Sequence, residues 1–235
     1  MENKSIKWRT NVRLVVATVG FEEKLPLRGL LKVGLGAGDV VMLVYSRTGG
    51  GFEVKKVERA VGVLKEIIES TGARVVEVEV SGTSFYDDVA RMLCSLRELK
   101  AGEVVAVLAG GMRLIAFEVL FALLMLHRHG KRQCARCNVL LMREDGLYDI
   151  TLPIESFYVT VPRTGLVVMR IINNHGEMKR SQLVKVASRE AGSSESAVYK
   201  VIKDMVKKGL VAIESENVKL TEMGRLLYTL LGEQA

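Results

Sequence analysis

Three glycine-containing segments carry the residue types that could bind an anionic ligand. They are ATVGF at 17–21, SRTGG at 46–50 and AGGMR at 109–113, and each follows an apolar run rich in valine. Glycine lets a backbone approach a phosphate closely, and the free amides and dipole of a helix N-terminus favour negative charge. Arg47 and Arg113 could add charge-assisted hydrogen bonds, and Phe21 an aromatic surface for a base. Together with the Thr18 hydroxyl, these groups predict a site for a phosphate-bearing ligand.

The same glycines also suit a purely structural turn. The phosphate-binding pattern GxxxxGK[ST] is absent, and GLGAGD at 34–39 precedes a strand instead of following one, so we expect a turn there. A close approach between a helix and a strand would use Gly110 and Gly111 equally well and leave Arg113 in solvent. Spacing alone leaves both interpretations open.

The apolar runs before these segments alternate with helical patterns. Strands are expected at 12–18, 39–45, 73–80 and 103–109, and helices at 53–71, 85–99 and 113–129. This order predicts parallel strands joined by right-handed crossovers, in an α/β Rossmann-like sheet. A hairpin formed by 137–143 and 146–152 would close the sheet. The helix at 113–129 is so apolar that we expect it to be buried on most sides.

A different pattern begins after Pro162. Helices are expected at 165–176, 179–192 and 193–209, followed by a hairpin at 210–220 that turns near Glu216 and Asn217, and by a helix at 221–231 capped by Thr221. Three helices followed by a hairpin is the element order of a winged helix-turn-helix. We therefore expect a sheet domain over 1–155 and a winged helix-turn-helix domain over 156–235.

The expected helix at 193–209 has an apolar side and a side that could read DNA. Residues 163–235 contain 12 Lys and Arg against eight Asp and Glu, a net charge of +4, which favours phosphate contact. The candidate DNA-binding residues are Ser194 or Ser196, Tyr199, Lys200 and Lys203 on this helix, and Lys179, Arg180 and Lys219 as phosphate contacts. The alternative is that the lysines form an ordinary solvated face and the domain binds proteins.

ATVGF after the first strand, GGMR after the fourth and the C-terminal winged helix together resemble the CRISPR-associated CARF and winged-helix transcriptional regulators of archaea. The resemblance covers nearly the whole chain. It implies a homodimer whose paired sheet domains bind cyclic oligoadenylate, commonly cyclic tetra-adenylate, and whose winged helices bind CRISPR promoter DNA. By the family's pattern the ligand-binding residues are Thr18, Gly20 and Phe21 in the first loop and Gly110, Gly111, Met112 and Arg113 in the second, with Thr83 and Ser84 as candidates in the loop after the third strand.

The segment before the two glycines departs from that family's pattern. Relatives often have a polar residue and a Ser or Thr there, whereas this chain has Val107 and Ala109. Backbone amides and Arg113 would then hold the nucleotide. Some CARF domains cleave their ligand, but no acid and base pair can be identified here, so we expect a sensor rather than an enzyme. A ring nuclease that uses its winged helix for dimerisation or docking is the alternative, and a DNA-binding protein with a vestigial sheet domain is a third possibility.

Other classes of site have less support in the sequence. Cys134 and Cys137 form a CxxC pair beside His127 and His129, but no second pair follows at zinc-site spacing, so we expect no metal and no cofactor. No apolar run reaches the roughly 18 residues of a membrane span. The N-terminus lacks an apolar signal core, and three cysteines make no disulfide framework, so we expect a cytoplasmic protein.

Overall fold

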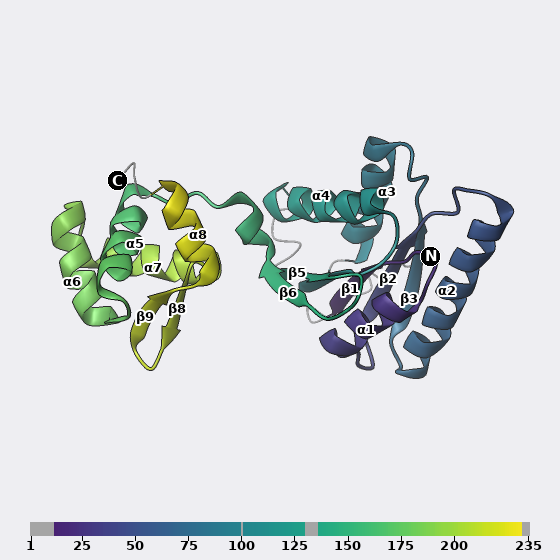
Figure 1. Ribbon diagram of the computed structural model, residues 1–235, viewed down its shortest axis with the longest axis horizontal. Coiled ribbons are helices and arrows are strands. Elements are labelled where there is room, and N and C mark those ends of the chain that lie inside the picture. Colours follow the sequence, from purple (N-terminus) through teal and green to yellow (C-terminus); the bar gives the residue numbers. More distant parts are fainter. Residues whose placement is uncertain (1–11, 100, 130–135, 232–235) are drawn as a thin grey trace, which may run out of the picture. The chain divides into compact units, whose positions relative to one another are not determined.

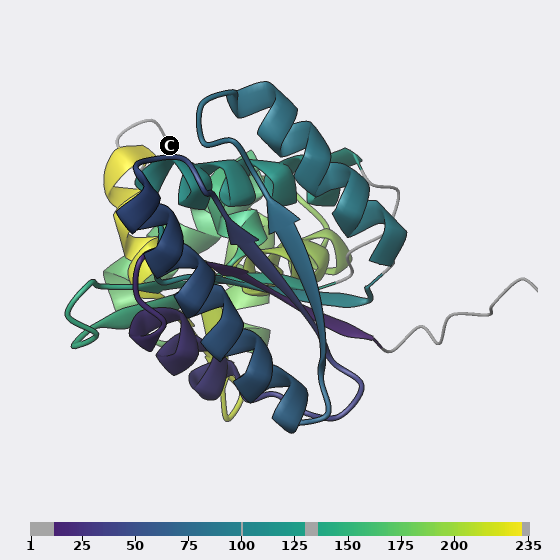
Figure 2. The same ribbon diagram turned by 90° about the vertical axis from the view of Figure 1, so that its right-hand side faces the viewer.

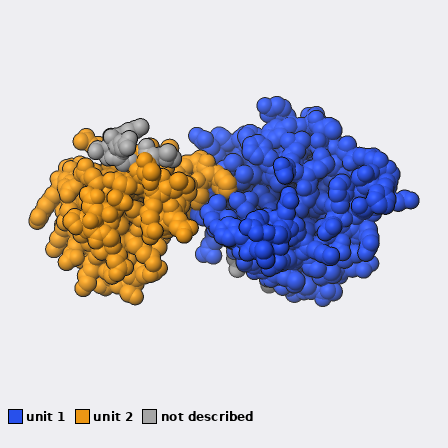
Figure 3. Space-filling model, in the orientation of Figure 1, with its two compact units in different colours: residues 1–154 blue, residues 155–235 orange. Residues whose placement is uncertain are grey.

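The computed structural model of the protein (Figure 1) describes residues 12–99, 101–129 and 136–231. Two compact units make up the chain, Met1–Ile154 and Glu155–Ala235 (Figure 3). A short 3₁₀ turn, η1 (Ile154–Tyr158), spans the division between them.

The first unit is built on a six-stranded sheet with the order β3-β2-β1-β4-β5-β6. Its strands are β1 (Arg13–Thr18), β2 (Val40–Tyr45), β3 (Arg74–Glu79), β4 (Glu103–Leu108), β5 (Arg136–Met142) and β6 (Asp149–Pro153). All neighbours pair in parallel except β6, which runs antiparallel to β5. The central strands are rich in valine because both of their faces are covered. This is the α/β Rossmann-like architecture that the sequence predicts.

Two helices cover each face of the sheet (Figure 1, Figure 2). Helices α1 (Lys24–Val33) and α2 (Gly51–Ser70) pack on one face, and α3 (Phe85–Leu99) and α4 (Arg113–His129) on the other. Side chains of a strand alternate between its faces, so Val15 of β1 packs in the α1–α2 core and Val16 in the α3–α4 core. Because β1, β2, β3 and β4 run parallel, the loops that lead from them to the following helices all lie at the same edge of the sheet, at the carboxyl ends of the strands.

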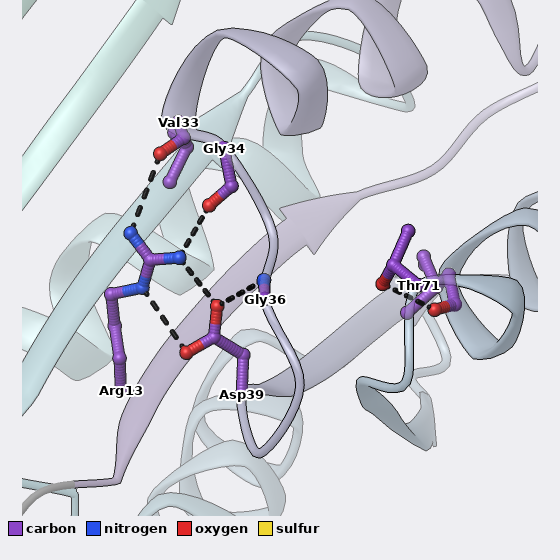
Figure 4. Close-up of polar contacts among 7 residues, drawn as sticks. Arg13, Val33, Gly34, Gly36, Asp39 and Thr71 are labelled. Carbon is purple, nitrogen blue, oxygen red and sulfur yellow. Dashed lines mark hydrogen bonds and ion pairs between the residues drawn. The ribbon is translucent and has the colours of Figure 1, made fainter.

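The opposite edge of the sheet is closed by a clasp around Arg13 (Figure 4). Its guanidinium bonds the carboxylate of Asp39 and donates to the carbonyls of Val33 (3.3 Å) and Gly34. The Gly36 amide also donates to Asp39, at 2.9 Å. These bonds hold the segment at 34–39 as the expected turn, between α1 and β2.

Two features of the first unit differ from the sequence prediction. Helix α1 was not predicted, because its ten residues include Pro26 and Gly29, which are poor helix formers. Gly29 is needed there, since a Cβ added to it would lie 2.3 Å from the Val107 side chain. Helix α4 buries six side chains, as its apolar sequence predicts, but one side is open, with Phe117 58% exposed and Leu114 39%.

The second unit combines helices with a three-stranded antiparallel sheet of order β7-β9-β8. Its elements are α5 (Arg163–His175), β7 (Met178–Lys179), α6 (Arg180–Ala191), α7 (Glu195–Lys207), β8 (Val211–Glu214), β9 (Asn217–Leu220) and α8 (Glu222–Leu231). Apolar faces of α5, α6 and α7 and of the hairpin form one core. The predicted order of three helices, hairpin and helix is confirmed, while β7 was not predicted.

Local details of the second unit refine the prediction. The hairpin turns at Ser215 and Glu216, whose φ values are 47° and 78°, one residue earlier than expected. The predicted cap is confirmed, because the Thr221 hydroxyl accepts a hydrogen bond from the Gly224 amide at 3.0 Å. A Cβ added to Gly224 would lie 2.0 Å from the Leu210 carbonyl oxygen, so glycine is required inside α8.

Candidate functional site

A cleft of about 450 Å³ opens at the carboxyl edge of the parallel strands. Its walls come from the loops after β1, β2 and β4, which the sequence singled out, and from the turn between β5 and β6. Five of the predicted ligand residues line it: Gly20, Phe21, Gly110, Gly111 and Met112. The volume lies within the range of small-molecule sites.

The glycines on the floor of the cleft bring two loops into direct contact. A Cβ added to Gly20 would lie 2.6 Å from the nitrogen and Cα of Gly111. Gly111 itself has φ +90°, and a Cβ there would lie 3.0 Å from the Val19 carbonyl oxygen. The glycines are therefore required by loop packing, and the same packing leaves bare backbone facing the cleft.

Five of the ten predicted ligand residues do not line the cleft, namely Thr18, Arg47, Thr83, Ser84 and Arg113. Thr18 is fully buried, and its hydroxyl has no hydrogen-bond partner among the residues that the structure describes. Arg47 follows β2, and its guanidinium pairs with Glu58 of α2 (3.6 Å) and Glu79 of β3 (3.5 Å). It also donates a hydrogen bond to the Tyr45 hydroxyl (3.3 Å). Neither side chain lines the cleft.

Arg113 is the first residue of α4 and follows Met112 at the rim of the cleft. Its side chain is exposed, and within the described part of the chain it makes no hydrogen bond or ion pair. The guanidinium is therefore available to a phosphate near the N-terminal amides of α4.

Thr83 and Ser84 belong to the loop between β3 and α3, beside the cleft rather than in it. The buried carboxylate of Asp88 holds this loop by accepting hydrogen bonds from the amides of Ser81 and Gly82, both at 2.8 Å. Burial by itself would raise the pKa of Asp88, but these hydrogen bonds lower it below the ordinary value. A Cβ added to Gly82 would lie 2.8 Å from the Met112 methyl carbon, so the loop abuts the rim.

Polar residues that the sequence analysis did not select also line the cleft. They are Glu22, Ser46, Thr48 and Glu144. The hydroxyls of Ser46 and Thr48 lie 2.7 Å apart, and Ser46 donates to the Ser81 carbonyl at 3.0 Å. Their position beside Arg47 in a strand-end loop was a signal for both. Glu144 had none, because only the tertiary structure brings the β5–β6 turn to this edge.

An aromatic and cationic group stands beside the cleft, on the side of α2. The Lys56 ammonium lies 4.4 Å from the centroid of the Phe52 ring and 6.0 Å from that of Phe21. Phe52 is 68% exposed and Phe21 53%. These two rings offer flat apolar surface with a positive charge between them.

Helix α4, whose residue Ile115 lines the cleft, also carries a buried acid. Glu118 is fully buried, and neither of its carboxylate oxygens has a hydrogen-bond partner among the described residues. Burial, together with the negative charge of Asp88, raises the pKa of Glu118 to about 7. This carboxyl therefore binds and releases a proton near neutral pH.

Residues 13–136 match a family model described as the Csa3 CRISPR-associated Rossmann-like domain. The match covers just over half of the chain. The chain belongs to this family. No curated protein matches it. The matched region of the Csa3-type domain includes the glycine loops and Arg113, whereas Glu144 and the second unit lie beyond it.

The second unit of this Csa3 family member presents the predicted DNA-binding residues on its surface, but their roles differ. Ser194 caps α7, since its hydroxyl accepts a hydrogen bond from the Ala197 amide at 3.3 Å, and Ser196 lies 3.2 Å from that hydroxyl. Lys219 pairs with Glu214 at 2.7 Å along the hairpin. These three side chains are thus partly engaged within the protein.

The remaining candidates are exposed around the start of α6 and along α7. Lys179, Arg180 and Tyr199 line a small hollow of about 100 Å³, and the Arg180 guanidinium lies 5.9 Å from the centroid of the Tyr199 ring. Tyr199 is 42% exposed. Lys200 and Lys203 are exposed on α7 and make no ion pair with another described residue.

The described residues considered for a metal site are divided between α4 and β5. Cys137 is buried in β5, and His127 and His129 end α4, while Cys134 lies outside the described residues. Within the described ranges, no three His, Cys, Asp or Glu side chains group closely enough to hold a metal ion. No helix among the described residues has the length and apolar character to cross a membrane.

Proposed function

We propose that this protein is a cyclic-oligoadenylate-responsive transcriptional regulator of CRISPR-related genes, which binds double-stranded operator DNA as a homodimer. The observation that carries the proposal is the cleft at the carboxyl edge of a Csa3-type domain, lined by the two glycine loops. The cyclic oligoadenylate, most simply cyclic tetra-adenylate, is an effector that the protein senses and does not cleave.

The rim of the cleft supports a nucleotide as the ligand. Arg113 is unpaired among the described residues and stands at the N-terminus of α4, where a phosphate is stabilised by the helix amides and by the guanidinium. The exposed ring of Phe21 provides a surface for a base.

An apolar surface on α3 and α4 supports the homodimer. Tyr86 is 79% exposed, Phe117 58% and Met125 38%. The partly buried Phe85 ties the surface together, since its ring centroid lies 5.4 Å from that of Tyr86 and 6.1 Å from that of Phe117. Exposed apolar patches of this kind mark interaction sites. Because α4 starts at Arg113, pairing through this surface would bring the ligand loops of two protomers together.

The second unit supports DNA binding as a winged helix-turn-helix domain. In this assignment α7 is the recognition helix, α6 precedes it and the β8–β9 hairpin is the wing. In the proposed complex, the exposed side chains of Tyr199, Lys200 and Lys203 on α7 face base edges and phosphates of the DNA. Lys179 and Arg180, at the start of α6, contact the DNA phosphate backbone. A ligand bound to the paired sheet domains changes operator affinity only if it prefers one arrangement of the two reading heads.

A thermal-shift panel tests the sensor part of the proposal. Rings of three, four and six adenylates are added to the full chain, to Arg113→Ala and to Arg97→Ala, a matched control on the exposed end of α3. Ligand at about 100 times its Kd stabilises the native state by about 2.7 kcal/mol, so the wild type and the control should both shift. Arg113→Ala should need more ligand for the same shift. No shift of the wild type with any ring contradicts the sensor.

Two further measurements separate the proposal from its alternatives. Chromatography of the ring after incubation with the protein should return it intact, whereas linear products would favour the ring nuclease. Duplex DNA from upstream of the CRISPR genes should bind with an affinity that falls steeply with salt. Absence of binding even at low salt would favour a protein-docking role for the second unit.

A further inference from the structure

The cleft carries negative rather than positive charge. None of the described residues that line it is a lysine or arginine, whereas Glu22 and Glu144 each contribute a carboxylate. Like charges repel more strongly beside a protein surface than in bulk water, so a phosphate is disfavoured next to these groups. A base or a ribose is favoured, because N–H and O–H groups donate hydrogen bonds to carboxylate oxygens.

The cations lie around the rim instead. Arg113 follows the cleft residue Met112, and the Lys56 ammonium lies 6.0 Å from the centroid of the Phe21 ring, which lines the cleft. Phosphates of a bound nucleotide therefore find positive charge at the mouth of the cleft. The same orientation directs a base inward, toward the carboxylates.

A local structural role accounts for the acidic residue at Glu22 but not for the one at Glu144. Glu22 lies two residues before α1 begins at Lys24, and a negative charge at a helix N-terminus stabilises the helix. Glu144 lies in the turn between β5 and β6, where no helix begins. It is exposed, and its carboxylate makes no hydrogen bond or ion pair with another described residue. Arg28 lies against the same turn beside Gly146 and acts on Asp145, but it forms no ion pair with Glu144, so no contact among the described residues accounts for the acid.

The turn that carries Glu144 is held firmly by its other residues. The Arg143 amide donates to the Tyr148 carbonyl at 2.9 Å, and the Gly146 amide donates to the Arg143 carbonyl at 2.8 Å. The Arg143 side chain also donates from Nε to both carboxylate oxygens of Asp145, at 2.8 Å each. Glu144 is thus presented to the cleft from a hydrogen-bonded turn, which favours a defined position for the acceptor.

We propose that Glu144 determines base specificity by accepting a hydrogen bond from the exocyclic amine of adenine in the bound cyclic oligoadenylate. This inference rests on the proposed function, because it assigns a contact within the same ligand site. The Glu144 carboxylate is exposed in the free protein, and a ring bound in the cleft would cover it. A covered carboxylate discriminates well, because a ligand without the amine leaves the charged acceptor unpaired.

The test compares two rings of equal size and two protein variants. One ring is cyclic tetra-adenylate, and in the other purine riboside, which lacks the amine, replaces adenosine. The variants are Glu144→Ala and Glu98→Ala, which removes the same charge from the exposed end of α3. Dissociation constants are measured by calorimetry on the full chain, after circular dichroism has established that each variant is folded.

The wild type and Glu98→Ala should bind the adenylate ring more tightly than the purine ring by roughly tenfold for each Glu144 contact, and so by about a hundredfold for a ring that both protomers of the dimer share. Glu144→Ala should lose about the same factor for the adenylate ring and should no longer distinguish the two rings. This loss of discrimination assigns the contact to the amine, because a general weakening would affect both rings equally.

Several results would overturn the inference while leaving the sensor intact. Tighter binding by Glu144→Ala would mean that the carboxylate faces phosphate, and an equal loss for both rings would mean that it contacts another part of the ligand. Wild-type affinity that depends on Mg²⁺, and loses this dependence in Glu144→Ala, would mean that the carboxylate holds a cation. If the wild type binds no adenylate ring, the proposed function fails and this inference fails with it.

Discussion

The contact between Gly20 and Gly111 makes Gly20→Ala the sharpest structural perturbation of the ligand site. The added methyl carbon would lie 2.6 Å from the Gly111 backbone, whereas non-bonded carbons rest at about 3.5 to 4.0 Å. The two loops must therefore move apart by about an ångström. The obstacle is backbone, so no side chain can rotate away. The loop after β1 is itself tied to β2, because the Val19 amide donates to the Val44 carbonyl at 2.9 Å.

Forcing such an overlap costs about 1 to 3 kcal/mol. At roughly 2 to 4 °C per kcal/mol for a protein of this size, the midpoint for the first unit should fall by about 2 to 12 °C. The assay is differential scanning calorimetry of the full chain, with ring binding measured on the same samples. Affinity should fall as well, because Gly20 and Gly111 both line the cleft.

The matched control is Gly62→Ala, on the exposed surface of α2. A Cβ added there meets nothing within 4 Å, and alanine is favoured over glycine inside a helix by about 0.5 to 1 kcal/mol. The same substitution should therefore raise the midpoint at Gly62 and lower it at Gly20. If Gly20→Ala melts and binds like the wild type, the close packing of the two loops is refuted.

Three further predictions address the acid, the DNA and the dimer. Native Glu118 keeps its proton up to about pH 7, whereas an unfolded glutamate loses it near 4.5, so the native state binds more protons between these values and the free energy of unfolding falls as pH rises. Glu118→Gln should reduce this fall, measured by urea unfolding at pH 5 and pH 8. An equal fall in the wild type and the variant would contradict the prediction. Lys200→Ala should weaken duplex binding and lower the salt slope by about 2, one phosphate contact for each protomer of the dimer, unlike Lys55→Ala on α2. Phe117→Glu should shift sedimentation from dimer to monomer, whereas Leu31→Glu on α1, where the leucine is 69% exposed against 58% for Phe117, should leave the dimer intact.

Periodicity and turn residues determined much of the fold. The strands around Val15 and Val105 are recognisable because valine-rich runs suit a sheet that is covered on both faces. The helices at 51–70 and 85–99 follow from apolar residues at helical spacing. Helix α1 escaped this reasoning because Pro26 and Gly29 lower local helix propensity, and packing against Val107 compensates for it.

The ligand loops show where the sequence stops being informative. Adjacent glycines and an arginine at 109–113 pointed to this edge of the sheet, and the structure places Gly110 and Gly111 in the cleft with Arg113 at its rim. Arg47 lies in the loop after β2, which also lines the cleft, yet ion pairs with Glu58 and Glu79 keep its side chain out of the cleft. The direction of a long side chain depends on charges that come from other elements of the fold.

The sequence by itself determined most of the strands and helices, though not α1 or β7, together with the two glycine loops and the basic residues of the second unit, because each depends on neighbours within a few residues. Only the tertiary structure decided that Glu144 joins the cleft, that Thr18 is buried and that Glu118 holds a proton near neutral pH. Each of these outcomes depends on segments that are distant in the chain. The β5–β6 turn carries Glu144 to the cleft, the assembled sheet buries Thr18, and the packing of α3 against α4 buries Glu118 and raises its pKa.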